Sequence, residues 1–547
     1  MAKKSFRNIL RLTAIAVSAT AVLSGAACGS GGSDFEQSGT LKALFPNSGI
    51  TDAEFVDNST TRLLEEITGQ KVEYAQMLGS SEESDVQSAL LDGGYSLIKM
   101  QRGSYDQNVI QGAFYDITDL IEEYGQNLLA TIDESAWDAC YYEGKLYAVP
   151  EVGFGHMYNN AIVFNMEHLA EVGITDVPST LTEFTDALHA LQDHFGSDPN
   201  YHAFSMPGAE AYQPLITGCF EVPYEFYVNE DDEITSWIYS QEADNYLHYM
   251  NDLNNYGNGC LSTSWAQATS ANVMGFYVQG LCSVAVLPYW NISGTCESMA
   301  ATGAADSAQD ALDNMGFALY LLGDGSYGSV DQTADNSWQL ADNTDIGYFC
   351  AIPATASEAE AIAAIKWMDA KITDENYRSF LVGKEGESYE LVTEEEYLAN
   401  EADEDSDTVI VPIEEADGTT QYYKLLAEYD NVKDNSMYQT GGNAEVGRRY
   451  WPLREAYYNC WGILMDVEDY DHVMTSALSR YSVIPSWSAV SITARSRIVT
   501  YIQNTINADD ENTFDRYFNY LKDTGFPNLW NDCDADVQAW YQSTKNS

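Results

Sequence analysis

The chain has 547 residues, of which 84 are acidic and only 25 are basic, so its formal net charge is −59 at pH 7. A field of this sign repels nucleic acid and anionic lipid headgroups, which excludes nucleic acid as a partner and favours neutral or cationic ligands. The length exceeds what one hydrophobic core usually supports, so we expect at least two lobes. The 38 tyrosines and 11 tryptophans suit stacking on carbohydrate, although many of these rings must serve ordinary packing.

The N-terminus has the pattern of an export signal. A basic segment that contains Lys3 and Arg11 precedes the apolar run 12–23, and this run ends in small residues. The run is too short to span a bilayer as a permanent helix. The pattern therefore predicts a cleaved signal peptide over residues 1–27.

Cys28 follows the signal at once and begins a Gly- and Ser-rich tether over residues 28–39. This arrangement resembles a bacterial lipoprotein signal, which implies that Cys28 is lipidated and anchors the exported protein to the outer face of the cell membrane. Gly25 stands where such signals have an aliphatic residue. Ordinary signal-peptidase cleavage and secretion without an anchor therefore stay open.

The next part of the chain alternates between strands and helices. We expect strands over 40–45, 71–77 and 95–100, with helices over 52–68 and 85–91 between them. This repeated order implies parallel βαβ units and a doubly wound sheet. Arg102 and Asp106 follow the third strand, and a solvated loop is the plain alternative to a role for them in binding.

Residues 276–290 place two large rings at the end of a predicted strand. A helical segment turns at Gly280 into the apolar strand 281–287, and Tyr289 and Trp290 come directly afterwards. Ligands of open α/β sheets lie outside the carboxyl ends of the strands, so both rings are candidates for ligand contact. Packing in the core or at its rim is the alternative.

Sequence motifs for catalysis or cofactor binding are weak. The letters Gly323-x-Gly325-x-x-Gly328 match a dinucleotide fingerprint, but no helix start follows them, so we expect a loop or a lobe crossover. The seven histidines include no His-Glu-x-x-His motif, and the eight cysteines after Cys28 show no metal-site spacing and leave their pairing open. Carboxylates are so abundant that a glycosidase-like pair carries no information. We expect no cofactor.

One acidic array fits part of a calcium-loop template. Its members occupy positions 1, 3, 5 and 12 of that template and are Asp403, Asp405, Asp407 and Glu414. Thr408 stands where the template needs glycine, and the following residues have the pattern of a strand. A hydrated acidic loop is the favoured interpretation, with calcium binding as the alternative.

Several segments, taken in order, resemble landmarks of one protein family. They are Tyr115–Ile121, Glu143–Pro150, 161–191, 208–220, 276–290 and 346–381. The family is that of the extracellular solute-binding proteins of ABC importers, in the maltose-binding-like cluster. Residues 383–398 and 514–541 resemble elements of its long lipoprotein-type branch. Two departures are a shorter spacing between Tyr212 and Pro214, and Ser388 in place of the usual histidine.

The resemblance implies an α/β, periplasmic-binding-protein-like fold of type II, with two doubly wound lobes joined by a multi-crossover hinge. The expected first lobe comprises 40–153 and 322–385. The expected second lobe comprises 154–321 and 386–547, with an acidic insertion at 394–421 and C-terminal helices.

The resemblance also implies a function without catalysis. We expect the protein to capture a carbohydrate, an oligosaccharide by preference, in the interlobe cleft and to deliver it to a membrane permease. The protein itself is expected to be a monomer. A secreted lyase or glycosidase and a peptide-binding lipoprotein with the same fold remain alternatives. The candidate ligand-binding residues are the rings Trp290, Tyr212 and Trp265, the polar or ring side chains Arg102, Asp106, Glu210 and Tyr158, and also Tyr289 and Trp451. Arg448 and Arg449, which precede Trp451, could neutralise an acidic sugar or simply pair with neighbouring acids.

Overall fold

A computed structural model describes most of the chain beyond the expected signal and tether. The described residues are 39–48, 51–78, 81–152, 157–158, 160–208, 212–262, 264–341, 348–403, 406, 408–426, 435–458, 465–466, 473–474, 476–478 and 484–545. The expected signal peptide and Cys28 lie outside this set. Among the described residues, no helix combines the length and the apolar character needed to cross a membrane.

The first lobe is built on a five-stranded sheet with the order β2-β1-β3-β15-β6. Strand β1 runs parallel to β2 and β3, whereas β15 runs antiparallel to β3 and β6. The expected βαβ start is therefore confirmed. The strands are β1 Leu41–Phe45, β2 Val72–Gln76, β3 Leu97–Met100, β6 Ala148–Glu151 and β15 Tyr348–Ala351.

Helices surround this sheet, and local capping explains where several of them begin. The region expected as one helix over 52–68 forms two, because Asn58 caps a new helix through a reciprocal capping box with Thr61. Gly69 ends the second helix in the left-handed conformation. The helices are α2 Asp52–Val56, α3 Ser59–Thr68, α4 Glu82–Asp92, α5 Arg102–Val109, α6 Thr118–Tyr124, α7 Gln126–Thr131, α8 Glu134–Asp138, α16 Glu358–Lys371 and α17 Asp374–Val382.

The second lobe has a four-stranded sheet with the order β13-β8-β12-β9. Its strands are β8 Asn160–Asn165, β9 Phe204–Ser205, β12 Val284–Pro288 and β13 Met315–Ala318. Strand β12 lies antiparallel to β8 and parallel to β9. The predicted strand at 281–287 is thus present with slightly shifted bounds.

Successive residues of β12 enter two different hydrophobic clusters. Val284 and Val286 pack on one side, whereas Ala285 and Leu287 pack on the other. A strand that is buried on both faces explains the continuous apolar run in the sequence. The helices of this lobe are α9 Met166–Glu171, α10 Leu181–Phe195, α11 Pro214–Thr217, α12 Gln241–Asn255, α13 Ser270–Val278, α14 Ile292–Thr302, α15 Ala308–Asp313, α21 Pro485–Ile506, α22 Glu511–Tyr520, α23 Pro527–Trp530 and α24 Asp534–Lys545.

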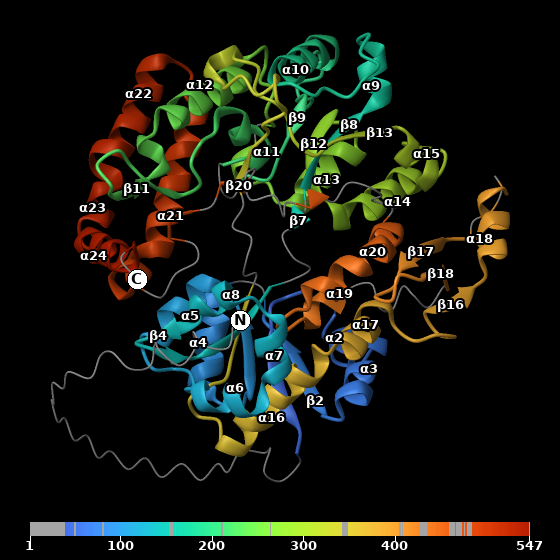
Figure 1. Cartoon of the computed structure of the whole chain (residues 1–547). Helices are drawn as coiled ribbons and strands as arrows, with labels where there is room; N and C mark the ends of the chain where they lie inside the picture. The colour runs from blue at the N-terminus through green and yellow to red at the C-terminus, as the bar shows by residue number, and fades with distance from the viewer. Residues whose placement is uncertain are drawn as a thin grey trace.

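Figure 1 shows the two lobes as separate bodies, one carrying the blue and gold segments and the other the green and red segments. The C-terminal helices α21 and α22 pack on the second lobe, since Ile502 and Phe514 belong to the same hydrophobic cluster as β8 and β12. Short strand pairs complete the fold. They are β4 Tyr141–Tyr142 with β5 Lys145–Leu146, β7 Met157–Tyr158 with β19 Met465–Asp466, β10 Phe226–Val228 with β11 Ile234–Ser236, and β14 Leu340–Ala341 with β20 Val473–Met474.

The packing differs from the expected lobe boundaries in two places, one within residues 322–385 and one after residue 386. Tyr389, Tyr423 and Leu453 belong to the core cluster of the first lobe, although we expected the chain from 386 onward in the second. Trp338 and Leu340 pack in the second-lobe cluster, not the first. The core of each lobe therefore recruits segments that are distant in sequence.

The chain between residues 387 and 458 forms a small appended sheet together with short helices. The sheet has the order β16-β18-β17, and the expected acidic insertion at 394–421 contributes β17 and the first residues of β18 to it. The elements are β16 Tyr389–Val392, α18 Glu394–Glu401, β17 Ile410–Glu414, β18 Thr420–Leu425, α19 Ala444–Arg449 and α20 Trp451–Tyr458. Glu415 ties the sheet to α19, because it accepts hydrogen bonds from the hydroxyls of Tyr423 and Tyr450, each at 2.6 Å.

Candidate functional site

Tyr289 and Trp290 follow the carboxyl end of β12 in a single 3₁₀ turn, Tyr289–Asn291, which leads into α14. Trp290 is 48% exposed, whereas Tyr289 is only 6% exposed. Their ring centroids lie 5.1 Å apart with an interplanar angle of 82°. An edge-to-face pair of this kind uses Tyr289 as the support and leaves Trp290 in contact with solvent.

Helix α20 contacts Tyr289 from the other side. The Trp451 ring lies 5.7 Å from the Tyr289 ring at an angle of 66°, and Arg454 Nε donates a hydrogen bond of 3.1 Å to the Tyr289 hydroxyl. The structure thus brings Tyr289, Trp290 and Trp451 together. It adds Arg454, which the sequence interpretation missed although it lies one helical turn after Trp451 on the same face.

Arg102 and Asp106 lie on α5, where that helix packs against α21 of the second lobe. They do not form a solvated loop. Arg102 Nε lies 3.4 Å from Asp106 Oδ2, and Asp106 is 7% exposed. Burial raises the pKa of the Asp106 carboxyl, and the positive charges of Arg102 and Arg495 oppose that rise.

The second lobe contributes a charged pair at this contact that the sequence interpretation missed. Arg495 of α21 forks the Glu225 carboxylate, with Nε–Oε1 at 2.8 Å and Nη2–Oε2 at 3.1 Å. The Glu225 charge raises the pKa of the Arg495 guanidinium. Because Glu225 and Arg495 are far apart in sequence, no local motif could have indicated the pair. Polar groups from both lobes therefore meet where α5 and α21 pack.

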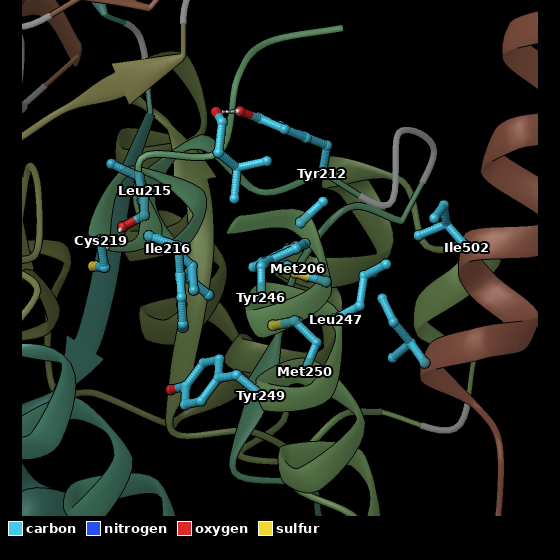
Figure 2. Packing of buried hydrophobic residues seen from close by; sticks show 14 of the residues in the cluster. Met206, Tyr212, Leu215, Ile216, Cys219, Tyr246, Leu247, Tyr249, Met250 and Ile502 are labelled. Atoms are coloured by element: carbon cyan, nitrogen blue, oxygen red, sulfur yellow. Dashed lines mark hydrogen bonds between the residues drawn. The ribbon is translucent and has the colours of Figure 1, made fainter. Parts of the chain in front are cut away.

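Tyr212 and Trp265 are core residues in the structure and not exposed stacking rings, which corrects the expectation from the sequence. Tyr212 packs among Tyr224, Trp237 and Tyr246. Its hydroxyl donates a 2.7 Å hydrogen bond to the Val222 carbonyl, as the dashed line in Figure 2 shows. Burial raises the pKa of this hydroxyl.

Trp265 is 1% exposed and is held from the C-terminal helices. Its indole N–H donates a 2.8 Å hydrogen bond to Asn507 Oδ1, which caps the end of α21. Both faces of this ring are used in packing against the protein. A ring in this position stabilises the second lobe and offers no face to a ligand.

The Tyr212→Phe substitution tests this assignment. We expect it to lower the free energy of unfolding by about 1–2 kcal/mol, because it leaves the buried Val222 carbonyl without its donor. Denaturant unfolding of the ligand-free protein measures this loss, and ligand affinity should stay unchanged. A loss of affinity without a loss of stability would return Tyr212 to the binding site.

Comparison with known proteins identifies the fold. No protein-family model matches the chain, and no curated protein sequence matches it either. Solved structures do match over nearly the whole chain. The alginate-binding protein AlgQ2 has 12% identity and a TM-score of 0.60 over 91% of this chain and 97% of its own. The N-glycan transport solute-binding protein NgtS of Streptococcus pneumoniae has 14% identity and a TM-score of 0.56, over 92% and 99% of the two chains.

A third match is the ABC substrate-binding protein Lmo0181 of Listeria monocytogenes, in complex with cycloalternan. It has 13% identity and a TM-score of 0.51, over 89% of this chain and 99% of its own. The chain has the solute-binding-protein fold of ABC transporters. In this solute-binding-protein fold, β12 with its terminal rings and α5 with its charged pair belong to different lobes.

The side chains of two expected site residues are not among those that the structure describes. Glu210 is not among the described residues, and for Tyr158 only the backbone in β7 is described. Arg449 pairs with Glu445 at 2.9 Å across one helical turn, so the interpretation in which it satisfies a neighbouring acid is confirmed for this residue.

The structure describes the glycine motif and part of the calcium template. Asp405 and Asp407 lie outside the described residues, and Glu414 is the last residue of strand β17, as the strand pattern predicted. Within the described ranges, no three His, Cys, Asp or Glu side chains group in a way that could hold a metal ion. Gly325 and Gly328 adopt positive φ in a turn, which agrees with the expected loop.

Seven of the cysteines are described, and all seven are buried and free. Burial raises the pKa of all seven thiols, for example to about 12 at Cys350. Thiols in such surroundings are poor nucleophiles. Their identities are Cys140, Cys219, Cys260, Cys282, Cys296, Cys350 and Cys533.

Proposed function

We propose that the protein is the substrate-binding component of an ABC importer and captures an oligosaccharide between its two lobes. The observation that carries the proposal is the half-exposed Trp290 at the carboxyl end of a central strand of the solute-binding-protein fold. Carbohydrate rings present flat C–H faces, and a tryptophan that is supported from behind and open in front is suited to stack on them.

Charged residues of both lobes support a carbohydrate ligand. Sugar hydroxyls both donate and accept hydrogen bonds, so a site for them combines carboxylates with guanidinium groups. Arg102 and Asp106 supply one such pair from the first lobe, and Arg495 with Glu225 supplies another from the second. Closure of the lobes would bury the ligand between these groups and the Trp290 ring.

Delivery and anchoring follow from the same proposal. The N-terminal pattern supports export with Cys28 as the lipidated residue, so the protein would act as a monomer at the outer face of the membrane and dock on permease subunits. The names of the structural neighbours record alginate, N-glycan and cycloalternan as ligands or cargo. These names support an oligosaccharide and leave its charge and linkage open.

A thermal-shift screen of residues 29–547 tests the function. The probes are maltotriose, a mannose–N-acetylglucosamine disaccharide, an alginate trisaccharide, a tripeptide and calcium. A ligand that binds only the folded state must raise the unfolding midpoint. A shift with one class of sugar, and recovery of that sugar unchanged, supports the proposal. Cleavage of the sugar indicates the enzyme alternative, and a response to the tripeptide alone indicates the peptide-binding alternative.

The Trp290→Ala substitution is expected to weaken binding of the responding sugar by about 1–3 kcal/mol, because the stacking surface is lost. Isothermal titration calorimetry measures the affinity. The midpoint of the ligand-free protein should stay close to that of the wild type, since the ring is half exposed. Tyr520→Ala is the matched control, because Tyr520 is also exposed (44%) but lies on α22. Equal affinities for wild type and Trp290→Ala would remove Trp290 from the site.

A further inference from the structure

The ring that supports Trp290 is held by a helix that is anchored in the other lobe. Tyr289 follows β12 of the second lobe, and its ring and hydroxyl contact Trp451 and Arg454 of α20. Within α20, Trp451 packs in a second-lobe cluster, whereas Leu453 and Ala456 pack in the first-lobe core. Figure 1 shows α20, in orange, on the side of the first lobe that faces the second. Helix α20 therefore contacts both lobes.

The contacts continue from Arg454 into the first lobe. Arg454 Nη1 donates a 3.4 Å hydrogen bond to Asn435 Oδ1, and Asn435 Nδ2 donates to the carbonyls of Phe380 and Leu381 at the end of α17. Arg454 is 7% exposed and Asn435 is 1% exposed. We name Tyr289, Arg454 and Asn435 the bracing chain. It joins the support of Trp290 to a helix of the first-lobe core by buried contacts.

Burial and chemistry make this chain stiff. A guanidinium group is planar and directs its donors in a fixed fork, so one Arg454 side chain sets the direction toward both Tyr289 and Asn435. Hydrogen bonds to a charged group in a medium of low dielectric are stronger than those in water. A rotation of the Tyr289 ring would break the bond from Arg454 and would also disturb the edge-to-face contact with Trp290.

We propose that Arg454 and Asn435 are positioning residues that fix the orientation of Tyr289 and, through it, the plane of Trp290. Because the bracing chain crosses from one lobe to the other, the orientation of the Trp290 ring depends on the relative placement of the lobes. The ligand step of this inference rests on the proposed function. The orientation of Trp290 in the ligand-free protein does not.

The first experiment needs no ligand. The full mature chain is labelled with 5-fluorotryptophan, and the ¹⁹F NMR resonance of Trp290 is assigned from its disappearance in Trp290→Phe. The Tyr289→Phe substitution keeps the supporting ring and removes only the acceptor for Arg454. We expect it, and Arg454→Met, to shift or broaden the Trp290 resonance. Arg449→Met is the control, because Arg449 lies on the adjacent helix α19 and pairs with Glu445.

An unmoved Trp290 resonance in Tyr289→Phe and Arg454→Met would overturn the proposal, even if both variants were less stable. That result would make Arg454 a structural residue only. A change of the same size in Arg449→Met would also overturn it, because the effect would then not depend on the bracing chain.

The second experiment uses whichever of maltotriose, the mannose–N-acetylglucosamine disaccharide or the alginate trisaccharide responds in the thermal-shift screen. Tyr289→Phe should raise the Kd of that sugar about three- to tenfold, from the loss of one positioning hydrogen bond. In Trp290→Ala the same substitution should have little further effect, because nothing remains to be positioned. Additive losses in the double variant would overturn the coupling. Failure of every sugar to bind would overturn the proposed function and leave the ¹⁹F result to decide the role of Arg454.

Discussion

Replacing Lys99 with methionine is expected to lower the free energy of unfolding by about 3–5 kcal/mol. Lys99 lies on β3 with its side chain 3% exposed, and its Nζ lies 2.6 Å from Glu151 Oε2 on β6. The same Nζ donates a 3.0 Å hydrogen bond to the Gln439 carbonyl. Removing the ammonium group leaves a carboxylate buried without its counter-charge, which is the costly way to break such a pair.

Denaturant unfolding, followed by circular dichroism, measures this loss. Lys145→Met is the matched control, because Lys145 forms an ion pair of similar length, 2.7 Å, with Asp116, but the two side chains are 57% and 35% exposed. The control should lose about 1 kcal/mol or less. The double variant Lys99→Met with Glu151→Leu should recover much of the loss, since the unpaired carboxylate is then removed as well. Equal losses at Lys99 and Lys145 would show that burial does not govern the first pair.

Much of the fold could be predicted from local patterns. The strands around Leu41, Leu97 and Val284 are short apolar runs between turn signals. Helices cover the sheets that contain them, so the strands are buried, and a continuous apolar run is sufficient to predict a buried strand. The division of the expected helix at Asn58 was harder to predict. The apolar periodicity continues through this point, and only the capping geometry of one side chain ends one helix and starts the next.

The roles of individual rings could not be predicted in the same way. Tyr212, Trp265 and Trp290 are all candidate stacking rings in the sequence, yet only Trp290 of the three is exposed. Buried Trp265 donates its indole hydrogen bond to Asn507, which is 242 residues away in sequence. A single sequence gives the residue type and the local element. It does not give the distant segment that covers the side chain.

The lobe assignment after residue 386 failed for a related reason. The appended sheet and α20 join the first-lobe core through scattered rings and aliphatic side chains such as Tyr423 and Leu453, and through polar contacts such as that of Arg378 with Tyr423. Arg378 Nη2 donates to the Tyr423 hydroxyl at 2.8 Å, from a helix 45 residues earlier. Hydrophobic periodicity cannot detect such contacts.

Lys371 is expected to make the stability of the protein rise with pH above neutrality. It lies on α16 with no exposed surface, and its Nζ donates a 2.7 Å hydrogen bond to the Tyr438 carbonyl. Burial lowers the pKa of Lys371 from 10.5 to about 7, and the charge of Lys99 adds to that lowering, whereas Cys350 and Glu151 oppose it. The folded state therefore loses this proton at a lower pH than the unfolded state does.

The direction of the pH effect follows from the proton count. Between about pH 7 and pH 10.5 the unfolded chain holds a proton on Lys371 that the folded chain has released. Raising the pH in this window therefore favours the folded state, by about 1.4 kcal/mol per pH unit or about 3 kcal/mol from pH 7.5 to 9.5. Below about pH 7 both states hold the proton, so this contribution to the slope disappears.

Lys371→Met should remove this contribution, and the measurement is the difference between the variant and the wild type in the slope of unfolding free energy against pH. Using the difference matters because other groups of this acidic chain also titrate and affect both proteins alike. Lys366→Met, which changes an exposed lysine on the same helix, should keep the wild-type slope. If Lys371→Met and the wild type had parallel curves between pH 7.5 and 9.5, Lys371 would be charged in the folded core. The Tyr438 carbonyl and the Glu151 carboxylate would then have to stabilise its ammonium group fully.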